Sequence, residues 1–459
     1  MLPENMWGQL PDRSARGIAA EIRRLVSMGL LSEGTRLPTV RVVAQELGIS
    51  PTTVSEAWQS LSRAGIVASH GRNGTVVLGI PDPILGPRRY RRVTQGGGQF
   101  ALDLSSGTPD PSLLPDMQAA LLRAATRVER GDGASMTYVD SAVLPELHGV
   151  LLRRWPFVPG ALTVVDGAMD ALDRISAVVV NRGDRVVVEA ACFPPLLDLL
   201  EQSGADVIGV AGDAEGISPD SLSAALDANP VALFLQPRAQ NPTGVSMTPG
   251  RAKQLCEILK PSAAVVIEDD HSGDIASAPV VSLGTGMPDR VVHILGFSKS
   301  HGPDLRLAAI GGAAAIVHAV ATRRMLGPGW SSRLLQGVLA DLLTDRAAIA
   351  SVAKARAAYA LRRSVVVDAL TTHGIDARAD DGINVWIAVE RESDALLALA
   401  ARGIGASPGS PFTVDASQPE HIRITVAGIL GTAAEIEPIV AEIAYALRSE
   451  RTQPWQRPS

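Results

Sequence analysis

Short apolar runs alternate with amphipathic helical patterns through most of this 459-residue chain. The clearest predicted strands are four runs rich in Val, Ile and Leu, at residues 185–189, 231–236, 263–268 and 291–295. Continuous apolar strands are typical of strands buried on both faces, and strands that alternate with helices usually pair in parallel. The pattern therefore predicts an α/β domain in which helices cover both faces of a mostly parallel central sheet.

A change in amino-acid composition before residue 101 indicates a boundary between two domains. Residues 80–100 are rich in Pro, Gly and Arg and lack sustained periodicity. We interpret them as a linker between a small domain at 12–79 and a large domain at 101–450.

Charge is unevenly distributed along the chain. Residues 1–92 contain 12 Arg and 7 Asp or Glu, a net charge of +5, whereas the whole chain carries −6. Local positive charge on an acidic protein fits a DNA-contacting module, because phosphate attraction needs only a basic patch.

The sequence favours a cytoplasmic protein with no membrane contact and no metal. The longest uncharged apolar run, residues 307–317, is shorter than the ~18 residues of a membrane helix, and the N-terminus lacks a secretory pattern. The two cysteines, Cys192 and Cys256, have the spacing of neither a disulfide framework nor a metal site. We expect both to be buried thiols.

Residues 39–61 have the pattern of two helices joined by a tight turn. Thr39 is a candidate N-cap of the first helix, and Gly48 suits the left-handed conformation that ends it. Ser50 is the candidate cap of the second helix, with Pro51 at its first position. The expected apolar positions are Val42, Val43 and Leu47 in the first helix and Val54, Ala57, Trp58 and Leu61 in the second.

This arrangement turns short hydroxyl side chains outward from the second helix: Thr52, Thr53 and Ser55. Such side chains can reach phosphates and base edges in a DNA major groove, and Arg41 on the first helix adds a candidate contact. Residues 66–69 and 75–78 predict a hairpin around a basic turn, which would be the wing of a winged helix-turn-helix. The alternative for this module is a small helical protein-interaction domain.

The N-terminal module resembles the winged helix of the GntR family along residues 17–78. The resemblance rests on GTRLP at 34–38, Arg41, LGISPTTV at 47–54 and LSRAG at 61–65. It implies binding to a double-stranded DNA operator through Arg41, Ser50, Thr52, Thr53, Ser55, His70 and Arg72. The chain departs from many relatives at Pro51, where they have a DNA-contacting arginine.

A lysine follows the last predicted strand. Lys299 is one of only four lysines, against 38 arginines. A lysine packed among apolar residues at a strand end can have a lowered amine pKa and form an imine with an aldehyde cofactor. Asp269, just beyond the strand at 263–268, could keep the nitrogen of a pyridine ring protonated. Taken alone, however, a Ser-Lys pair is usually a solvated loop, and an acidic residue there can cap a helix.

Three further segments contain candidate cofactor contacts. Asn241, in the sequence NPTG, could hydrogen-bond the phenolic oxygen of pyridoxal, although these residues also form ordinary turns. Phe193 could stack on the ring. Small residues before a predicted helix could let a phosphate approach its N-terminus, namely Gly167 and Ala168, followed by Met169. Because ligands bind beyond the carboxyl ends of parallel strands, the order of these segments favours one shared site.

Residues 101–459 resemble fold type I aminotransferases, and the whole chain resembles the MocR subfamily of GntR regulators. The resemblance rests on SGTPD at 106–110, Tyr138, NPTG at 241–244, IEDD at 267–270, SKS at 298–300, Arg306 and IRI at 422–424. It implies pyridoxal 5'-phosphate as cofactor, a smaller C-terminal subdomain and a homodimer. The implied roles are an imine on Lys299, phosphate binding by Ser298 and Arg306, a carboxylate clamp at Arg423, and an approach of Tyr138 to the other subunit's site.

The chain departs from this family at several positions. His271 stands where most relatives have a tyrosine that bonds the cofactor's phenolic oxygen; a histidine can also donate this bond, and its charge can respond to pH. Met169 replaces a polar residue near the phosphate. Val143 and His148 replace a glycine and an arginine that commonly follow Tyr138. These departures weaken the case for efficient transamination more than the case for cofactor binding.

Three functions fit these observations. The first is a transcription factor that senses a small amino compound, or pyridoxal phosphate itself, and thereby changes its domain arrangement and DNA affinity. The second is an active aminotransferase that a DNA-binding module localises or regulates. The third is a regulator with an empty, degenerate cofactor cradle, in which Lys299 is only structural. The retained positions for imine, pyridine, phosphate and carboxylate argue against the third.

Overall fold

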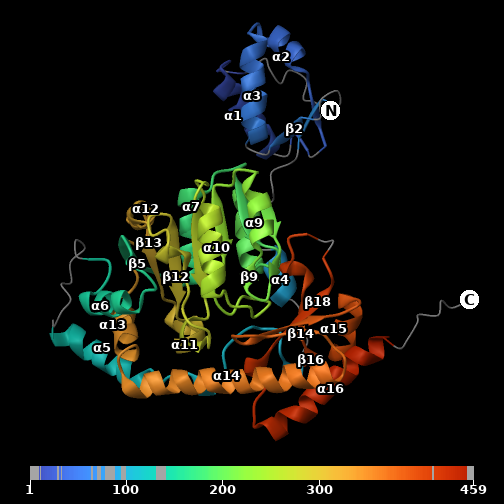
Figure 1. Ribbon diagram of the computed structural model, residues 1–459. Helices are drawn as coiled ribbons and strands as arrows, with labels where there is room; N and C mark the ends of the chain where they lie inside the picture. Colours follow the sequence, from blue (N-terminus) through green and yellow to red (C-terminus); the bar gives the residue numbers. More distant parts are fainter. Residues whose placement is uncertain are drawn as a thin grey trace, which may run out of the picture. The chain divides into compact units, whose positions relative to one another are not determined.

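The computed structural model describes residues 10, 12–27, 30–32, 34–63, 66–69, 74–77, 88–94, 100–130, 141–415 and 418–451. The chain forms two compact units, a small one made mainly of residues 1–86 and a large one made of most of residues 87–459 (Figure 1). Over the described ranges, no helix has the length and apolar character that would span a membrane. The same ranges contain no cluster of His, Cys, Asp and Glu that could hold a metal ion.

The small unit combines three helices with a three-stranded antiparallel sheet. Its elements are α1 (Ala15–Ser27), β1 (Arg36–Leu37), α2 (Val40–Leu47), α3 (Pro51–Arg63), β2 (Val67–Ser69) and β3 (Thr75–Val77). Strand β3 lies between β1 and β2 and pairs antiparallel with both. Apolar side chains from all three helices and from the sheet form one core. This is the predicted winged helix-turn-helix.

The predicted helix ends in this unit are confirmed. The Thr39 hydroxyl accepts a hydrogen bond from the backbone N of Val42 at 3.4 Å at the start of α2. Gly48 ends α2 in the left-handed region, with φ of 66°. The Ser50 hydroxyl accepts a hydrogen bond from the backbone N of Thr52 at 3.1 Å at the start of α3.

The apolar face of α2 differs from the prediction at one position. Val43 and Leu47 are buried, but Val42 is 43% exposed and Ala44 lies in the core instead. Residues three and four apart share one face of a helix, so positions 43, 44 and 47 turn inward together while position 42 turns away. All four predicted core positions of α3 are buried, namely Val54, Ala57, Trp58 and Leu61.

A seven-stranded sheet forms the centre of the large unit. In order across the sheet, its strands are β5 (Ala161–Val165), β13 (Ala308–Gly312), β12 (Val291–Gly296), β11 (Val265–Asp270), β10 (Ala232–Leu235), β6 (Arg185–Glu189) and β7 (Asp206–Val210). The strands from β12 to β6 pair in parallel, and β13 runs antiparallel to both of its neighbours. The mostly parallel sheet is therefore confirmed, and the four predicted strands correspond to β6, β10, β11 and β12.

Helices of the large unit bury the apolar surface of this sheet. They are α5 (Gln118–Arg130), α6 (Pro145–Arg154), α7 (Ala168–Val179), α8 (Pro194–Ser203), α9 (Pro219–Leu226), α10 (Pro249–Leu259), α11 (Ser298–His301), α12 (Ala314–Arg324) and α13 (Arg333–Leu342). Residues of α9 and α10 form one core with β6, β10 and β11, whereas residues of α5, α6 and α13 form another with β5, β12 and β13. As predicted, Cys192 and Cys256 are buried and unpaired.

A smaller C-terminal subdomain follows the long helix α14 (Arg346–Thr372), which Figure 1 shows in orange along the lower edge of this unit. Its four-stranded sheet has the order β14 (Ala377–Arg378), β15 (Asn384–Ala388), β18 (His421–Thr425) and β17 (Ser407–Pro408), and its helices are α15 (Glu392–Ala400) and α16 (Ala433–Arg451). Two short pairs complete the strands: β4 (Leu102–Asp103) with β16 (Ile404–Gly405), and β8 (Gly212–Asp213) with β9 (Gly216–Ile217).

Part of the predicted linker is helical, which corrects the prediction of an irregular segment. Residues 88–94 form α4 (Arg88–Thr94). Asp198 of α8 accepts hydrogen bonds from the backbone N of Arg89 and of Tyr90, each at 3.0 Å, at the first turn of α4. A carboxylate at this end stabilises a helix, and this one comes from a distant part of the sequence. The remaining residues of the predicted linker before Phe100, at 80–87 and 95–99, lie outside the described residues.

Candidate functional site

Lys299 lies in α11, directly beyond the end of β12. Its Nζ donates a hydrogen bond to the carbonyl oxygen of Gly107. Burial first, and then the positive charge of Arg423, lower the pKa of the Lys299 amine to about 8. This amine is therefore neutral and nucleophilic more often near neutral pH than an ordinary lysine, in agreement with the sequence-based expectation.

Asp269 carries a buried carboxylate with one oxygen left without a donor. Strand β11 extends to Asp270, so Asp269 lies inside the strand and not just after it. Gln236 Nε2 donates to Asp269 Oδ2 at 2.8 Å, whereas Oδ1 is buried and has no partner among the described residues. Burial is the main reason that the pKa of Asp269 is raised to about 6. A protonated ring nitrogen would supply both the missing donor and a compensating charge.

A second buried carboxylate, Glu189, lies beside Asp269 at the end of β6. Its Oε2 accepts a hydrogen bond from the backbone N of Gln236 at 3.0 Å. Burial, with a smaller contribution from the nearby charge of Asp269, raises the pKa of Glu189 to about 8. Glu189, Asp269 and Phe193 line one cavity of about 10 Å³, which places the predicted ring-stacking residue next to the predicted pyridine partner. Sequence reasoning missed Glu189, although it ends a predicted strand.

Gly167 and Arg306 meet where a phosphate group was predicted. Gly167, with φ of 101°, precedes α7, whose N-terminal amides form a natural anion site. A Cβ added to Gly167 would lie 3.1 Å from Arg306 Nη2, so only glycine leaves this approach open. Arg306 Nη2 also donates to the Asp166 carbonyl oxygen at 3.4 Å. Ser298 and Met169 lie in the first turns of α11 and α7, respectively.

Arg423 is a buried guanidinium in β18, only 3% exposed. Its Nη1 donates to Asn241 Oδ1 at 3.2 Å, and its Nη2 donates to the Ser105 carbonyl oxygen. Burial lowers the pKa of Arg423 to about 10, so the group stays charged at neutral pH, and its Nε has no partner among the described residues. A Cβ on Gly107 would lie 3.3 Å from Arg423 Nη2, which explains the glycine at that position. A carboxylate ligand would compensate this charge.

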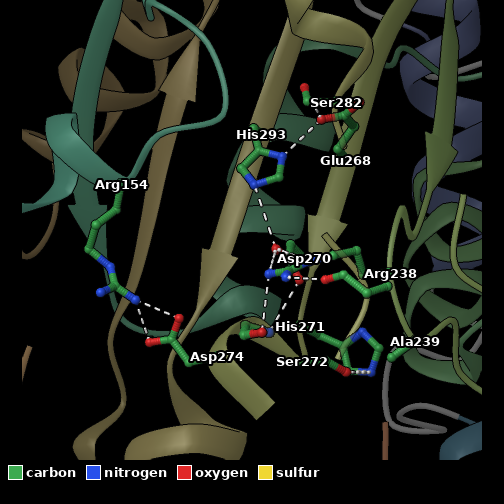
Figure 2. A network of polar contacts seen from close by, with 12 residues as sticks. Arg154, Arg238, Ala239, Glu268, Asp270, His271, Ser272, Asp274, Ser282 and His293 are labelled. Atoms are coloured by element: carbon green, nitrogen blue, oxygen red, sulfur yellow. Dashed lines mark hydrogen bonds and ion pairs between the residues drawn. The ribbon is translucent and has the colours of Figure 1, made fainter. Parts of the chain in front are cut away.

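His271 directly follows β11, and its environment corrects one expectation. Its Nε2 lies 3.2 Å from the hydroxyl of Ser272, and its Nδ1 is buried without a partner among the described residues (Figure 2). Burial and then the charge of Lys299 lower the pKa of His271 to about 4. The ring is therefore neutral across the physiological range, so the idea that its charge responds to pH was wrong. A neutral ring can still donate one hydrogen bond.

A buried polar network holds the segment after β11 (Figure 2). Arg238 Nη2 lies 2.6 Å from Asp270 Oδ2, with both side chains almost fully buried, and it also donates to the Gly273 carbonyl oxygen at 3.1 Å. On the other side of Asp270, His293 Nδ1 lies 2.8 Å from Glu268 Oε2. These contacts fix the end of β11 and thus the position of Asp269 and His271.

Helix α4 packs near Arg423. Val93 of α4 forms a small apolar cluster with Trp386 and Phe412. The Arg423 guanidinium lies 5.0 Å from the centre of the Phe412 ring. Within the described residues, α4 is the first helix after the predicted DNA-binding module, and only the Phe412 side chain separates its Val93 from the predicted carboxylate clamp.

The structure brings most predicted site residues together. Lys299, Asp269, Asn241, Phe193 and Gly167 all lie at or beyond the ends of β12, β11, β10, β6 and β5, respectively. In the small unit, Arg41, Ser50 and Thr52 are exposed, and Thr53 and Ser55 are partly exposed, on α2 and the start of α3. The predicted roles of His70, Arg72 and Tyr138 fall on residues outside those that the structure describes.

Two family models match the chain. The model for "Bacterial regulatory proteins, gntR family" matches residues 14–77, and that for "Aminotransferase class I and II" matches residues 101–443. The vitamin B6 salvage pathway transcriptional repressor PtsJ of Salmonella typhimurium is 34% identical over 446 residues, which cover 95% of this chain and 99% of that protein. The chain is a MocR-type regulator of the GntR family.

Other comparisons agree with this assignment of the MocR-type regulator. The regulator TauR of Rhodobacter capsulatus is 28% identical, over 93% of this chain and 96% of its own. Among solved structures, kynurenine aminotransferase of Pyrococcus horikoshii has a TM-score of 0.71 at 20% identity and covers 82% of this chain and 98% of its own. The large unit thus has the fold type I aminotransferase architecture, and the protein is a DNA-binding transcriptional regulator.

Proposed function

We propose that this MocR-type regulator holds pyridoxal 5'-phosphate on Lys299 and changes its affinity for operator DNA when a small amino compound or the cofactor itself binds. The observation that carries the proposal is the unpartnered, buried Oδ1 of Asp269, which lies at the same sheet edge as a lysine of lowered pKa. Without a ligand, this oxygen of Asp269 is a buried acceptor that no donor reaches, an arrangement that is costly. The residues present therefore fit the cofactor.

The chain's own residues have distinct roles in this proposal. When bound, the cofactor supplies an aldehyde that condenses with amines. Lys299 would hold it covalently, Asp269 would keep its ring nitrogen protonated, and Phe193 would pack on the ring. Asn241 and His271 donate hydrogen bonds to its phenolic oxygen. The residues that would hold its phosphate, at the start of α7 and α11, are Gly167, Ala168, Met169, Ser298 and Arg306.

The proposed effector is an amino compound with a carboxylate, which Arg423 clamps. Its amine competes with Lys299 for the cofactor, so ligand binding can favour one domain arrangement over another. The name of the PtsJ repressor refers to vitamin B6 salvage, which supports pyridoxal phosphate as a signal in its own right. The DNA-binding surface comprises Arg41, Ser50, Thr52, Thr53 and Ser55, together with His70 and Arg72 of the wing.

We also propose a domain organisation and an assembly. The DNA-binding domain occupies residues 12–79 and the cofactor-binding domain residues 101–450, with residues 80–100 between them. The protein is a homodimer in which Tyr138 approaches the site of the other subunit. Sedimentation of the purified protein as a monomer at micromolar concentration would contradict this assembly.

A catalytic aminotransferase is the second candidate function. It is favoured by the retention of Lys299, Asp269, Arg306 and Arg423 in an aminotransferase fold. Turnover of an amino acid with a keto acid by the purified protein would establish it.

The experiment that tests the proposed function is a DNA-binding titration on the cognate upstream region. Affinity is measured without ligand, with pyridoxal phosphate, and with pyridoxal phosphate plus each of a panel of amino acids. We expect at least one condition to change the affinity by several-fold, within the usual range of allosteric coupling. The same affinity under every condition would overturn the sensing proposal.

Replacing Arg41 with alanine should weaken DNA binding and reduce its dependence on salt. Arg41 is exposed on α2, and loss of one phosphate contact lowers the slope of log affinity against log salt by about 1. Fluorescence anisotropy at several salt concentrations measures this slope. The matched control is Arg378→Ala, because Arg378 is an exposed arginine in the large unit. Equal slopes for the two variants would remove Arg41 from the DNA contacts.

The rate of cofactor loading should rise with pH and level off above about 8. Only the neutral amine of Lys299 can attack an aldehyde, and its pKa is lowered to about 8. The rate should therefore fall about tenfold for each pH unit below that value. Growth of the bound-cofactor absorption band after mixing with pyridoxal phosphate, followed between pH 7 and 10, gives the midpoint. A midpoint near 10.5, the ordinary value for lysine, would contradict the buried placement of this amine.

Replacing Asp198 with alanine should weaken the response of DNA affinity to ligand. Asp198 holds the first turn of α4, and α4 contacts Phe412 beside Arg423 through Val93. Release of this turn should uncouple the linker from the effector site, while ligand affinity measured by the cofactor's absorption stays within twofold of wild type. A full ligand response in the variant would show that α4 does not carry the signal.

A further inference from the structure

A chain of three buried hydrogen bonds leads from Gly107 to Asn241. The backbone N of Gly107 donates to the Thr425 hydroxyl at 3.1 Å, and that hydroxyl donates to Asn384 Oδ1 at 3.1 Å. Asn384 Nδ2 then donates to Asn241 Oδ1 at 3.3 Å. Thr425, Asn384 and Asn241 are 2%, 5% and 7% exposed, so water does not compete freely for these bonds.

One end of this series of hydrogen bonds permits its direction, and the other end fixes it. A backbone N–H can only donate, so the Thr425 hydroxyl accepts from Gly107 and can give its own proton to Asn384 Oδ1. The Asn384 amide is thereby oriented with its NH2 group toward Asn241. At the other end, Arg423 can only donate, and it also contacts Asn241 Oδ1, at 3.2 Å. The oxygen of the Asn241 amide therefore accepts two hydrogen bonds. A flipped Asn241 amide would direct its NH2 group at the donor Arg423, and a flipped Asn384 amide would bring its oxygen against the oxygen of Asn241.

This arrangement leaves one donor of Asn241 unused. The Asn241 backbone N donates to Gln236 Oε1 at 2.8 Å, which anchors the main chain. Its side-chain Nδ2 makes no hydrogen bond to any part of the chain that the structure describes. The amide thus presents its NH2 group, and not its oxygen, to whatever acceptor enters the site.

We propose that Asn384 is a positioning residue that holds the Asn241 amide with its NH2 group directed at the phenolic oxygen of the cofactor. This inference rests on the proposed function, because it takes pyridoxal phosphate as the acceptor. Arg423 shares the task, but it is also the proposed clamp for the effector carboxylate. Asn384 is the donor that stays in place when Arg423 engages a ligand.

The test is the titration midpoint of the bound cofactor's absorption band in the Asn384→Leu variant of the full-length protein. Leucine has a similar volume but cannot donate to Asn241 Oδ1. A donor withdraws charge from the phenolic oxygen; without it, the chromophore holds its proton more tightly. The midpoint should therefore move to higher pH by about half to one unit, and the shift should be larger with succinate bound at Arg423.

Two further variants separate positioning from a general loss of stability. Thr425→Val keeps the side-chain shape but frees the Asn384 amide to flip, so it should give a smaller shift in the same direction. Gln336→Leu removes another fully buried carboxamide of the large unit, one that bonds Ala142, Leu144 and Ser331 and no residue of this chain of bonds. It should leave the midpoint unchanged. The nearby titratable groups, Glu189, Asp269, His271, Lys299 and Arg423, are the same in all variants.

The outcomes distinguish this inference from the function on which it rests. If the Asn384→Leu and Thr425→Val variants have the same titration midpoint as the wild-type protein, the positioning role is overturned and the proposed function stays intact. An equal shift in Gln336→Leu overturns it as well. Absence of any band in wild-type protein removes the proposed function and this inference together.

Discussion

Replacing Lys299 with alanine is expected to abolish the absorption band of covalently bound pyridoxal phosphate. Lys299 is the amine at the sheet edge next to Asp269, and its neutral form is accessible because its pKa is lowered to about 8. The other three lysines are exposed: Lys253, Lys260 and Lys354. Spectra of the purified proteins, recorded after incubation with pyridoxal phosphate and removal of the free cofactor, measure the effect.

The matched control for this variant is Lys354→Ala, which removes an exposed lysine from α14. It should retain the full band. A band of wild-type intensity in Lys299→Ala would place the cofactor on another amine, and the sensing chemistry proposed here would then be wrong.

Replacing Arg238 with methionine should lower the free energy of unfolding by about 3–5 kcal/mol. Asp270 has a side-chain exposure of 0%, and Arg238 makes two hydrogen bonds to its Oδ2, at 2.6 and 3.1 Å. Methionine fills similar space but leaves a buried carboxylate without its cation. Urea unfolding of the cofactor-free protein, followed by a signal from the large unit, measures the loss.

The double variant Arg238→Met with Asp270→Asn distinguishes this cause from poor packing. Asparagine removes the uncompensated charge, so the double variant should recover a large part of the lost stability. If both variants are equally unstable, packing of the Arg238 side chain and not charge compensation determines the effect.

Local patterns predicted much of the architecture. The strands β6, β10, β11 and β12 are apolar runs that can be recognised without knowing their partners in the fold. The caps Thr39 and Gly48 depend only on residues next to them in the sequence. The order of Gly167, Phe193, Asn241, Asp269 and Lys299 after successive strands was enough to place them at one sheet edge, since strands that run in the same direction end on the same side.

The remaining features depend on partners that are distant in the sequence. The first turn of helix α4 is held by the Asp198 carboxylate, and no periodicity in residues 88–94 predicts that contact. Asn384 matters because Thr425 and Asn241, 41 and 143 residues away, lie on either side of its amide. The neutrality of His271 likewise results from burial, which the sequence around it does not reveal.

Reduction with borohydride followed by peptide mass spectrometry tests the central claim most directly. Reduction makes the link between the cofactor and its lysine permanent, and digestion then locates the added mass among the chain's four lysines. The account predicts one labelled peptide, the one that contains Lys299, with a label that an amino-compound effector displaces before reduction. Labelling confined to Lys253, Lys260 or Lys354, or no specific label at all, would contradict it.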